Sequence, residues 1–519
     1  MTGIILTTLN ARYSHCAFGL RYLYANLKEL QAQAKILEFT ISQNTRDIAE
    51  HILSEKPKIV GFGVYIWNTR QTQEVVSILK RVQPDLKIVL GGPEVSYETE
   101  TQEICKLADL TIKGEADFLF YELCTEYLKD GSWPKEKWIS GALPDILKLV
   151  MPYAHYTDHD VKNRVIYVEA SRGCPYKCEY CLSSLDKSVR SFDLEAFLTA
   201  MSILIDRGAR QFKFIDRTFN LSIATSSKIL QFFLDRISLG LFLHFEMVPD
   251  RLPEELRTLI SRFPAGSLQF EIGIQTWNVD VAKLVSRRQD YQKIRENFAF
   301  LAEKRNVHTH ADLIAGLPGE TIESFAIGFD AVSELAPDEI QVGILKRLKG
   351  TPIIRHDQEW QMVYQEHPPF QVLQTRLMSY ETLQRISRFA HFWDLVANSG
   401  NFKQSMLALT ELSKKRPTPS LFWEFDELAR FLNKRHPQGH SIALLNLLES
   451  VWIYFKDEKH MSEETVRAML VQDYVGTIKR DIPVFLRSGL ETTGFQQNKK
   501  EGSRAATPAR QKRHLARES

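Results

Sequence analysis

Short runs of β-branched and aromatic residues alternate with amphipathic, helix-like stretches along most of this chain, and this alternation limits the fold more than any other feature. The first 130 residues contain five such runs, at 4–6, 34–39, 58–65, 87–90 and 110–113. Strands joined through helices pair in parallel, so we expect a doubly wound parallel sheet. Such sheets bind ligands beyond the carboxyl ends of their strands. Four polar or glycine-rich loops should meet there, at residues 10–15, 65–68, 91–94 and 113–115.

A second alternating series follows a connector rich in Gly, Trp and Pro at about residues 131–152. Its predicted strands are 165–168, 212–215, 241–245, 268–272, 311–314 and 340–344. Helix candidates of a dozen or more residues lie between them, for example 194–205 and 322–335. Six β/α units of this kind predict a full or partial barrel, whose chemistry would lie at the carboxyl ends of the strands.

The last part of the chain changes character. Residues 371–487 are helical in pattern and rich in aromatic residues, which predicts an all-α appendage, and the segment beyond residue 494 has few apolar residues and should be disordered. We therefore expect five parts of an α/β protein. They are a sheet domain (1–135), a linker (136–160), a barrel (161–365), a helical domain (366–488) and a basic, disordered tail (489–519).

Charge and hydropathy narrow the class of protein. The formal net charge is +2, which does not indicate a nucleic-acid partner, although the tail is locally basic. No stretch approaches the roughly 20 apolar residues of a spanning helix, and the first residues lack the basic start of a secretory signal. We expect a cytoplasmic protein without a membrane partner.

Three of the six cysteines fall within eight residues, at Cys174, Cys178 and Cys181, directly after the first predicted barrel strand. Three thiolates at this CxxxCxxC spacing can bind three irons of a [4Fe-4S] cluster and leave the fourth iron open to another ligand. The alternative is a zinc site, but a structural zinc ion takes four protein ligands, and no fourth Cys or His follows at a suitable spacing. The motif therefore predicts an iron-sulfur cluster.

This motif, at this point of a barrel, resembles that of the radical S-adenosylmethionine (SAM) superfamily. The resemblance implies that the open iron chelates SAM through its amine and carboxylate. It also implies that one electron, from an external donor such as flavodoxin or ferredoxin, cleaves SAM to a 5'-deoxyadenosyl radical. Tyr180 matches the aromatic residue that lies near the SAM adenine in that superfamily, and packing in the core is its alternative role.

Further residues near the predicted strand ends are candidates for binding SAM. Glu246 and Glu271 are expected to contact the ribose or position the substrate. Arg287 falls where relatives bind the SAM carboxylate, and Gly316 lies in a glycine-rich segment that resembles the one beside the adenine. The Gly-Gly-Glu-like motif for the SAM amine is missing, and Asp216 is one of two candidates for that contact, with Thr218 as the other.

The amino-terminal sheet resembles the cobalamin (B12)-binding domain of one large radical SAM subgroup. Its sequence Gly91-Gly92-Pro93-Glu94 is the characteristic loop, because glycines let a corrin ring lie against the backbone. Asn10 and Tyr65, in neighbouring loops, are further candidates to contact the cofactor. The Asp-x-His-x-x-Gly pattern that supplies an axial histidine is absent. We therefore expect base-off cobalamin without a histidine ligand, with His15 as the alternative ligand.

The resemblance extends to a branch with a poorly characterised helical carboxyl-terminal domain, and it implies a cobalamin-dependent methyltransferase acting on an unactivated carbon or a similar centre. Cyclisation or rearrangement uses the same cofactors. A methylthiotransferase would need a second cluster on three amino-terminal cysteines, and a non-catalytic sensing or docking module is a further alternative. The sequence does not reveal the substrate, because specificity lies in loops without a readable code.

Overall fold

The computed structural model describes residues 3–439, 441–475, 483–487 and 507–515, and the chain divides into two compact units. The first unit contains Met1–Arg217, and the second begins at Thr218 and contains most of the remaining chain. Two later segments, Lys346–Ile354 and Tyr364–Gln371, return to the first unit. Among the described residues, no helix combines the length and apolar character that crossing a membrane requires.

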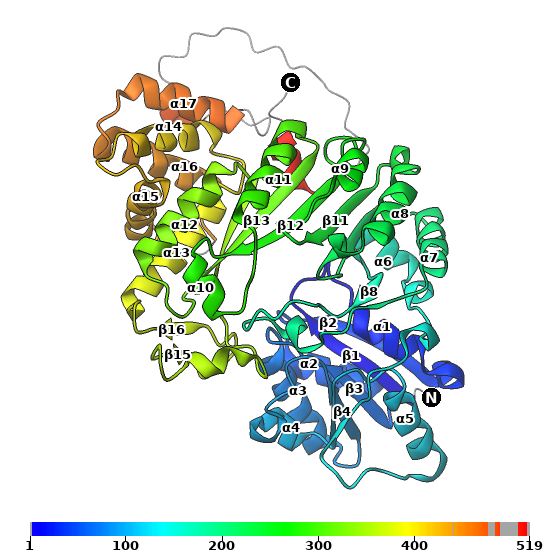
Figure 1. Ribbon diagram of the computed structural model, residues 1–519. Coiled ribbons are helices and arrows are strands. Elements are labelled where there is room, and N and C mark those ends of the chain that lie inside the picture. The colour runs from blue at the N-terminus through cyan, green and yellow to red at the C-terminus, as the bar shows by residue number, and fades with distance from the viewer. Residues whose placement is uncertain (1–2, 440, 476–482, 488–506, 516–519) are drawn as a thin grey trace. The chain divides into compact units, whose positions relative to one another are not determined.

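A parallel six-stranded sheet forms the centre of the first unit, with the strand order β2-β1-β3-β4-β5-β6 (Figure 1). Its strands are β1 (Ile4–Asn10), β2 (Ala34–Thr40), β3 (Ile59–Gly63), β4 (Lys87–Gly91), β5 (Leu110–Lys113) and β6 (Trp138–Ser140). The first five confirm the prediction. The sixth, β6, lies inside the stretch predicted as a connector, because a run of three residues is too short to show strand periodicity.

Helices cover both faces of this sheet, because its strands carry apolar side chains on both sides. One face packs on α2 (Thr45–Ser54), α3 (Thr69–Val82) and α4 (Glu103–Leu107). The other face packs on α1 (Phe18–Ala25) and α5 (Leu119–Asp130). Strands buried on both faces are typical of parallel sheets, and this arrangement leaves only the ends of the strands open to ligands.

The first unit also contains the beginning of the second β/α series. A short helix, α6 (Asp158–Asn163), precedes β7 (Ile166–Val168), which pairs in parallel with β10 (Gln211–Phe214). Between them lie α7 (Leu194–Asp206) and a two-stranded antiparallel hairpin that the sequence did not predict. The hairpin strands are β8 (Ser171–Arg172) and β9 (Arg190–Ser191), and their connecting loop carries all three clustered cysteines.

The second unit continues the series with four parallel strands, each paired with the next. The strands are β11 (Phe242–Met247), β12 (Leu268–Gln275), β13 (Val307–Ala315) and β14 (Glu339–Ile344). The main helices between them are α8 (Ile223–Leu234), α9 (Glu254–Ile260), α10 (Val279–Leu284), α11 (Tyr291–Lys304) and α12 (Ile322–Glu334). All six predicted strands of this series are present, in β/α alternation, as expected.

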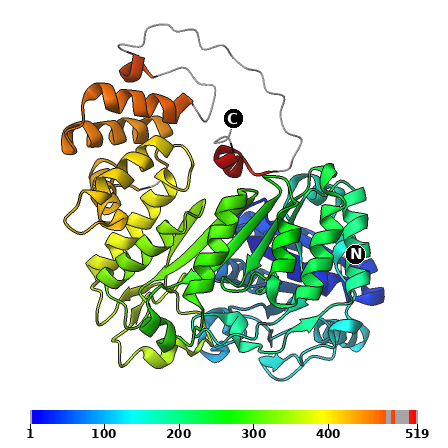
Figure 2. The same cartoon turned by 45° about the horizontal axis from the view of Figure 1, so that its top comes forward.

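A helical region follows a short pair of strands, β15 (Val363–Tyr364) and β16 (Val372–Gln374) (Figures 1 and 2). Its helices are α13 (Tyr380–Val396), α14 (Lys403–Lys414), α15 (Leu421–Arg435), α16 (Leu444–Ile453), α17 (Glu463–Val475) and α18 (Val484–Arg487). Stacked rings of Phe389 and Phe422 join α13 to α15, with ring centres 4.5 Å apart. The predicted all-α region is thus present.

The expected disorder of residues 489–519 is wrong for residues 507–515. This segment contains α19 (Ala509–Leu515), shown in red beside the green strands in Figure 2. Thr507 Oγ1 donates to the Gly266 carbonyl at 2.7 Å, and the His514 ring lies 5.0 Å from that of His308 at the start of β13. The sequence did not predict these contacts, because they are polar and the segment has few apolar residues. The rest of the expected tail, 489–506 and 516–519, lies outside the described residues.

Candidate cofactor site

The structure brings the four loops expected at the carboxyl edge of the sheet together around two cavities. One cavity has a volume of about 220 Å³ and is lined by backbone at Gly61, Gly63, Gly91, Gly92 and Gly114. Apolar side chains such as Phe62 and Phe120 complete its wall. Glycines at the edge of a sheet let part of a ligand approach the backbone closely, because they carry no side chain.

Different local features explain why glycine stands at position 91 and at position 92. Gly92 has a positive φ of 110°, and a Cβ atom there would lie 2.5 Å from the Val64 carbonyl oxygen. A Cβ atom at Gly91 would meet no atom within 4 Å. Gly92 is therefore required by the fold of the loop, whereas Gly91 leaves open space at the edge of the cavity.

The loop after β3 contributes two stacked aromatic rings. The ring centres of Tyr65 and Trp67 are 4.5 Å apart, and their planes differ by 5°. Asn68 holds the loop in place, because its Oδ1 accepts the Tyr65 backbone N–H at 2.8 Å and its Nδ2 donates to the Leu9 carbonyl at 3.1 Å. Tyr65 lines both cavities, and Trp67 lines the larger one.

The larger cavity, of about 520 Å³, lies where the sheet loops meet the start of the second β/α series. Asn10 lines it from the end of β1 and His15 from the loop after β1, and Tyr167 and Glu169 line it from β7 and the residues after β7. His15 Nδ1 shares a hydrogen bond with the Tyr167 hydroxyl, and burial lowers the pKa of His15. The imidazole therefore faces this cavity mainly in its neutral form.

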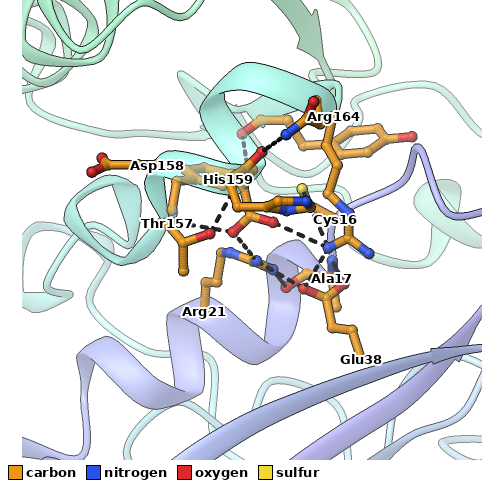
Figure 3. Close-up of polar contacts among 12 residues, drawn as sticks. Cys16, Ala17, Arg21, Glu38, Thr157, Asp158, His159 and Arg164 are labelled. Atoms are coloured by element: carbon orange, nitrogen blue, oxygen red, sulfur yellow. Dashed lines mark hydrogen bonds and ion pairs between the residues drawn. The ribbon is translucent and has the colours of Figure 1, made fainter.

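Four buried charged side chains fix the loop that carries Asn10 and His15 (Figure 3). Arg21 contacts Glu38 and Asp160, each at 2.8 Å, and Arg164 contacts the same two carboxylates at 3.1 and 3.2 Å. Glu38 Oε2 also accepts hydrogen bonds from Asn10 Nδ2 and from the Ala17 backbone, both at 2.7 Å. Because each charge has two opposite neighbours, the cluster can remain buried, and it ties α1 and β2 to α6.

The cysteine loop is shaped by its backbone. Cys174 and Cys178 are buried and Cys181 is partly exposed. The Cys174 N–H donates to the Asp186 carbonyl at 3.0 Å, and the Ser184 hydroxyl donates to the carbonyls of Cys178 and Cys181 at 2.9 and 2.7 Å. These bonds hold the backbone of the loop that carries the three thiols.

The described residues contain no group of three His, Cys, Asp or Glu side chains already placed around one metal-ion site. The type and number of the donors therefore indicate the kind of metal centre. A zinc ion would gather its thiolates at about 2.3 Å from one centre, whereas a cubane binds each thiolate through a separate iron. The donor set, three thiols in one loop, is also that of a cluster with one open iron.

Arg172, two residues before Cys174, lies at the centre of a second buried charge network. Its guanidinium contacts Glu169 at 2.9 Å, Glu115 at 2.7 Å and Asp117 at 3.3 Å, and it lines both cavities. Burial raises the pKa of Glu169 to about 7, and the charge of Arg172 opposes this effect. The network places a cation between the sheet loops and the cysteine loop.

Asp216 is buried at the end of β10. Its carboxylate accepts hydrogen bonds from the Ala170 backbone at 3.0 Å and from the Ser171 hydroxyl at 2.7 Å, and burial raises its pKa to about 6. These bonds fix the turn between β7 and β8. The contacts therefore give Asp216 a structural role, which weakens its candidacy for the SAM amine.

The other candidates for SAM contacts fall in the second unit, except Tyr180, which is buried in the cysteine loop. Glu246 and Glu271 are partly buried and face each other in register on β11 and β12, and Glu271 pairs with His244 Nε2 at 2.9 Å. Arg287 donates to the Ile274 carbonyl at 3.0 Å, at the end of β12. A Cβ atom at Gly316 would lie 2.6 Å from Val372, so packing alone explains this glycine.

Glu94 is not among the residues that line either cavity. Its buried carboxylate forms a salt bridge with Lys349, in the segment that returns to the first unit. Arg347 of the same segment contacts Glu98 at 3.1 Å. In this structure the Glu94 carboxylate thus contacts the returning segment, and its predicted contact with a cofactor stays a prediction.

Sequence reasoning missed both charge networks, of which Arg21, Glu38, Arg172 and Glu115 are the main members. Most of their partners lie far apart in the chain, for example 139 residues for Arg21 and Asp160. One signal was available: Arg172 directly precedes the Gly-Cys of the cysteine motif, and Glu115 lies in a loop already predicted at the sheet edge.

Comparisons with known protein families agree with this architecture. Residues 4–123 match the B12 binding domain, residues 168–327 match the radical SAM superfamily, and residues 358–515 match a protein family of unknown function. The first two matches cover the glycine-lined cavity and the cysteine loop, respectively.

Individual relatives are distant. An uncharacterized methyltransferase of Pyrococcus horikoshii is 24% identical over 406 residues, which are 72% of this chain and 83% of that protein. The 2-(S-pantetheinyl)-carbapenam-3-carboxylate methyltransferase of Streptantibioticus cattleyicolor is 24% identical over 57% of this chain, and the match spans 48% of its own length.

The fold is shared with a solved structure. The radical SAM methyltransferase TsrM of Kitasatospora setae, with tryptophan substrate and a SAM analogue bound, is 16% identical, with a TM-score of 0.55 over 72% of this chain and 85% of that chain. One conclusion follows from the matches to protein families, together with the cysteine loop and the glycine-lined edge of the sheet. The chain belongs to the radical SAM superfamily, in the subgroup with an amino-terminal B12-binding domain, and it ends in a helical domain of uncharacterised function.

Proposed function

We propose that the protein is a cobalamin-dependent radical SAM methyltransferase that acts on an unactivated centre of its substrate. The 520 Å³ cavity is the main support, because residues of the B12-binding domain and residues beside the cysteine loop line the same space. A methyl donor held by the sheet loops would therefore face the region where a radical is generated.

When bound, the cofactors supply the chemistry: the cluster and SAM generate a carbon-centred radical, and methylcobalamin supplies the methyl group. Cys174, Cys178 and Cys181 would hold the cluster and leave one iron open. Gly91, beside the cavity, would let the corrin approach the backbone, and the cofactor would bind without a bond to His15, which shares a hydrogen bond with Tyr167.

A methylthiotransferase is less well supported. Its second cluster would need three further cysteines close together, but Cys105 and Cys124 are buried in α4 and α5, and Cys16 follows β1. We further propose a reducing, cytoplasmic location with flavodoxin or ferredoxin as the electron donor; the six cysteines, all among the described residues, form no disulfide.

Anaerobic purification with cobalamin supplied tests the proposal. We expect about four irons per chain, a corrin spectrum, and reductive cleavage of SAM on addition of a one-electron reductant. About eight irons would instead indicate two clusters, and stoichiometric zinc without iron would overturn the proposal. Product mass then separates the reactions: a gain of one methylene supports methyl transfer, whereas an isomer of the substrate indicates rearrangement.

The variants Cys174→Ala and Cys181→Ala should lose the cluster. Most of the iron should be absent from these proteins, and they should not cleave SAM. Cys124→Ala is the matched control, because Cys124 is buried in α5 and packs in the core on one face of the sheet. This control should keep its iron at a cost in stability of about 1 kcal/mol.

A further inference from the structure

Two loops of the B12-binding domain connect to the cysteine loop, one by direct contact with the strands at its base and the other through the returning segment. The first is the loop after β5, where Gly114, Ala116 and Asp117 line the glycine-rich cavity and Glu115 points to the hairpin. Glu115 contacts Arg172 on β8 and Arg190 on β9. Because these arginines lie opposite each other in the hairpin, one carboxylate clamps both strands from which the cysteine loop emerges.

The clamp continues in both directions. On the cysteine side, Arg190 also contacts Asp186 at 3.0 Å, and the Asp186 carbonyl accepts the N–H of Cys174 at 3.0 Å. On the cavity side, the N–H of Gly114 donates to Ser96 Oγ at 3.1 Å, and that hydroxyl donates to the Gly92 carbonyl at 2.8 Å. Consecutive contacts thus connect the Gly91-Gly92 loop with Cys174.

A second connection runs through the returning segment, residues 346–354. Lys349 forms a salt bridge with Glu94, in the loop after β4, and the N–H of Ile353 donates to the Glu179 carbonyl at 3.0 Å. Glu179 lies between Cys178 and Cys181 in the chain. The same short segment therefore contacts a loop beside the cobalamin cavity and the cysteine loop.

We propose that Glu115 is a positioning residue that couples cobalamin binding to the cysteine loop, so that each of the two cofactors strengthens the binding of the other. Glu94 contributes a smaller part of the coupling, because it connects to the cysteine loop only through Lys349 and the backbone of the returning segment. The inference rests on the proposed function and deepens it. Its physical basis is that a ligand seated on the Gly92 and Gly114 loops would favour the arrangement in which Glu115 pairs with Arg172 and Arg190, and this arrangement holds the hairpin that presents the thiols. Coupling of this kind must be reciprocal, and its usual size is about 5- to 150-fold in affinity.

Hydroxocobalamin binding is measured for the full chain with the cluster reconstituted and for the same chain without iron. For the unaltered protein we expect the dissociation constant to be at least about fivefold lower when the cluster is present. In Glu115→Gln this ratio should fall towards one. The matched control is Glu126→Gln, an exposed glutamate on the following helix α5, which should keep the full ratio.

The reciprocal measurement follows iron loss to a chelator by the decay of the cluster absorbance. Hydroxocobalamin should slow this loss at least several-fold in the unaltered protein and in Glu126→Gln, and have little effect in Glu115→Gln. Should Glu115→Gln fold poorly, Glu115→Asp keeps the charge and should give an intermediate ratio, while Glu94→Gln tests the second connection separately.

The outcomes separate the two proposals. A protein that binds both cofactors with a ratio of one, or a Glu115→Gln variant with an unchanged ratio, overturns the coupling and leaves the methyltransferase proposal standing. A protein that binds no cobalamin at all overturns the proposed function, and the coupling with it.

Discussion

Gly91 and Gly92 are neighbours in the chain, but a side chain would affect them differently. At Gly92 the backbone conformation and the nearby Val64 carbonyl oppose any other residue, whereas at Gly91 there is space. A substitution at Gly92 therefore tests the folding of the loop, and a substitution at Gly91 tests whether a ligand occupies the cavity.

We predict that Gly91→Ala leaves the melting temperature of the cofactor-free protein within about 2 °C and weakens hydroxocobalamin binding at least tenfold, because the new methyl group occupies space beside the cavity. Equilibrium dialysis measures the affinity. Unchanged affinity would show that the corrin does not lie against Gly91.

Gly92→Ala should lower the stability of the cofactor-free protein by about 1–3 kcal/mol, since a positive φ of 110° is strained for alanine and its Cβ would approach the Val64 oxygen. Denaturant unfolding of Gly92→Ala and Gly91→Ala, compared side by side, measures the difference. Equal stability of the two variants would contradict this account of the loop.

At the scale of elements, Glu320 joins the turns that follow β12 and β13. It is fully buried, Thr276 Oγ1 donates to it at 3.0 Å, and burial raises its pKa to about 8. The folded state thus holds a proton that the unfolded chain releases near pH 4.5. A raised pKa in the folded state means that the stability is full below about pH 4.5 and falls as the pH rises towards 8.

Glu320→Gln removes this titration while keeping the shape. We predict that the unaltered protein loses stability relative to the variant between pH 5 and 8, by at most about 1.4 kcal/mol per pH unit, and that the difference becomes constant above pH 8. Thermal unfolding of both proteins across this range is the measurement. A constant difference throughout would mean that Glu320 is ionised in the folded state.

The helix α19 is an element whose contacts can be removed without touching the cofactor loops. A chain that ends at residue 506 loses the buried contacts of Thr507 and His514 with the strands β12 and β13 and the residues before them. We expect a melting temperature lower by several degrees and faster amide exchange at the start of β13, with iron content unchanged. A chain that ends at residue 515 is the control and should behave like the full chain.

Sequence patterns predicted the elements well where several residues share one periodicity. All five strands of the first series and all six of the second are present, because runs of buried apolar residues mark them. β6, the β8–β9 hairpin and α19 escaped prediction because two or three strand residues, or a polar docking face, carry no periodic signal. The thiols were identifiable from spacing alone, but the partners of Arg172 and Arg21 depend on tertiary structure.

On the scale of the whole molecule, the match to the radical SAM superfamily spans residues 168–327, whereas the compact units divide at residues 217 and 218. The cysteine loop, β7 and β10 therefore belong, by their contacts, with the B12-binding domain. The boundaries of the family matches therefore differ from those of the compact units. The reason is that buried ion pairs join the sheet domain to the start of the barrel series.

This grouping has a consequence for protein engineering. Transplanting residues 1–135 alone into another scaffold would separate Arg21 and Glu38 from Asp160 and Arg164, and would strand buried ions without counter-charges. A chimaera that exchanges residues 1–217 together with the returning segments 346–354 and 364–371 keeps all four partners together, and it also keeps the buried Glu94 with Lys349. In exchanges of B12-binding domains among such enzymes, the first crossover should therefore lie after Arg217. This is well beyond residue 123, where the match to the B12 binding domain ends.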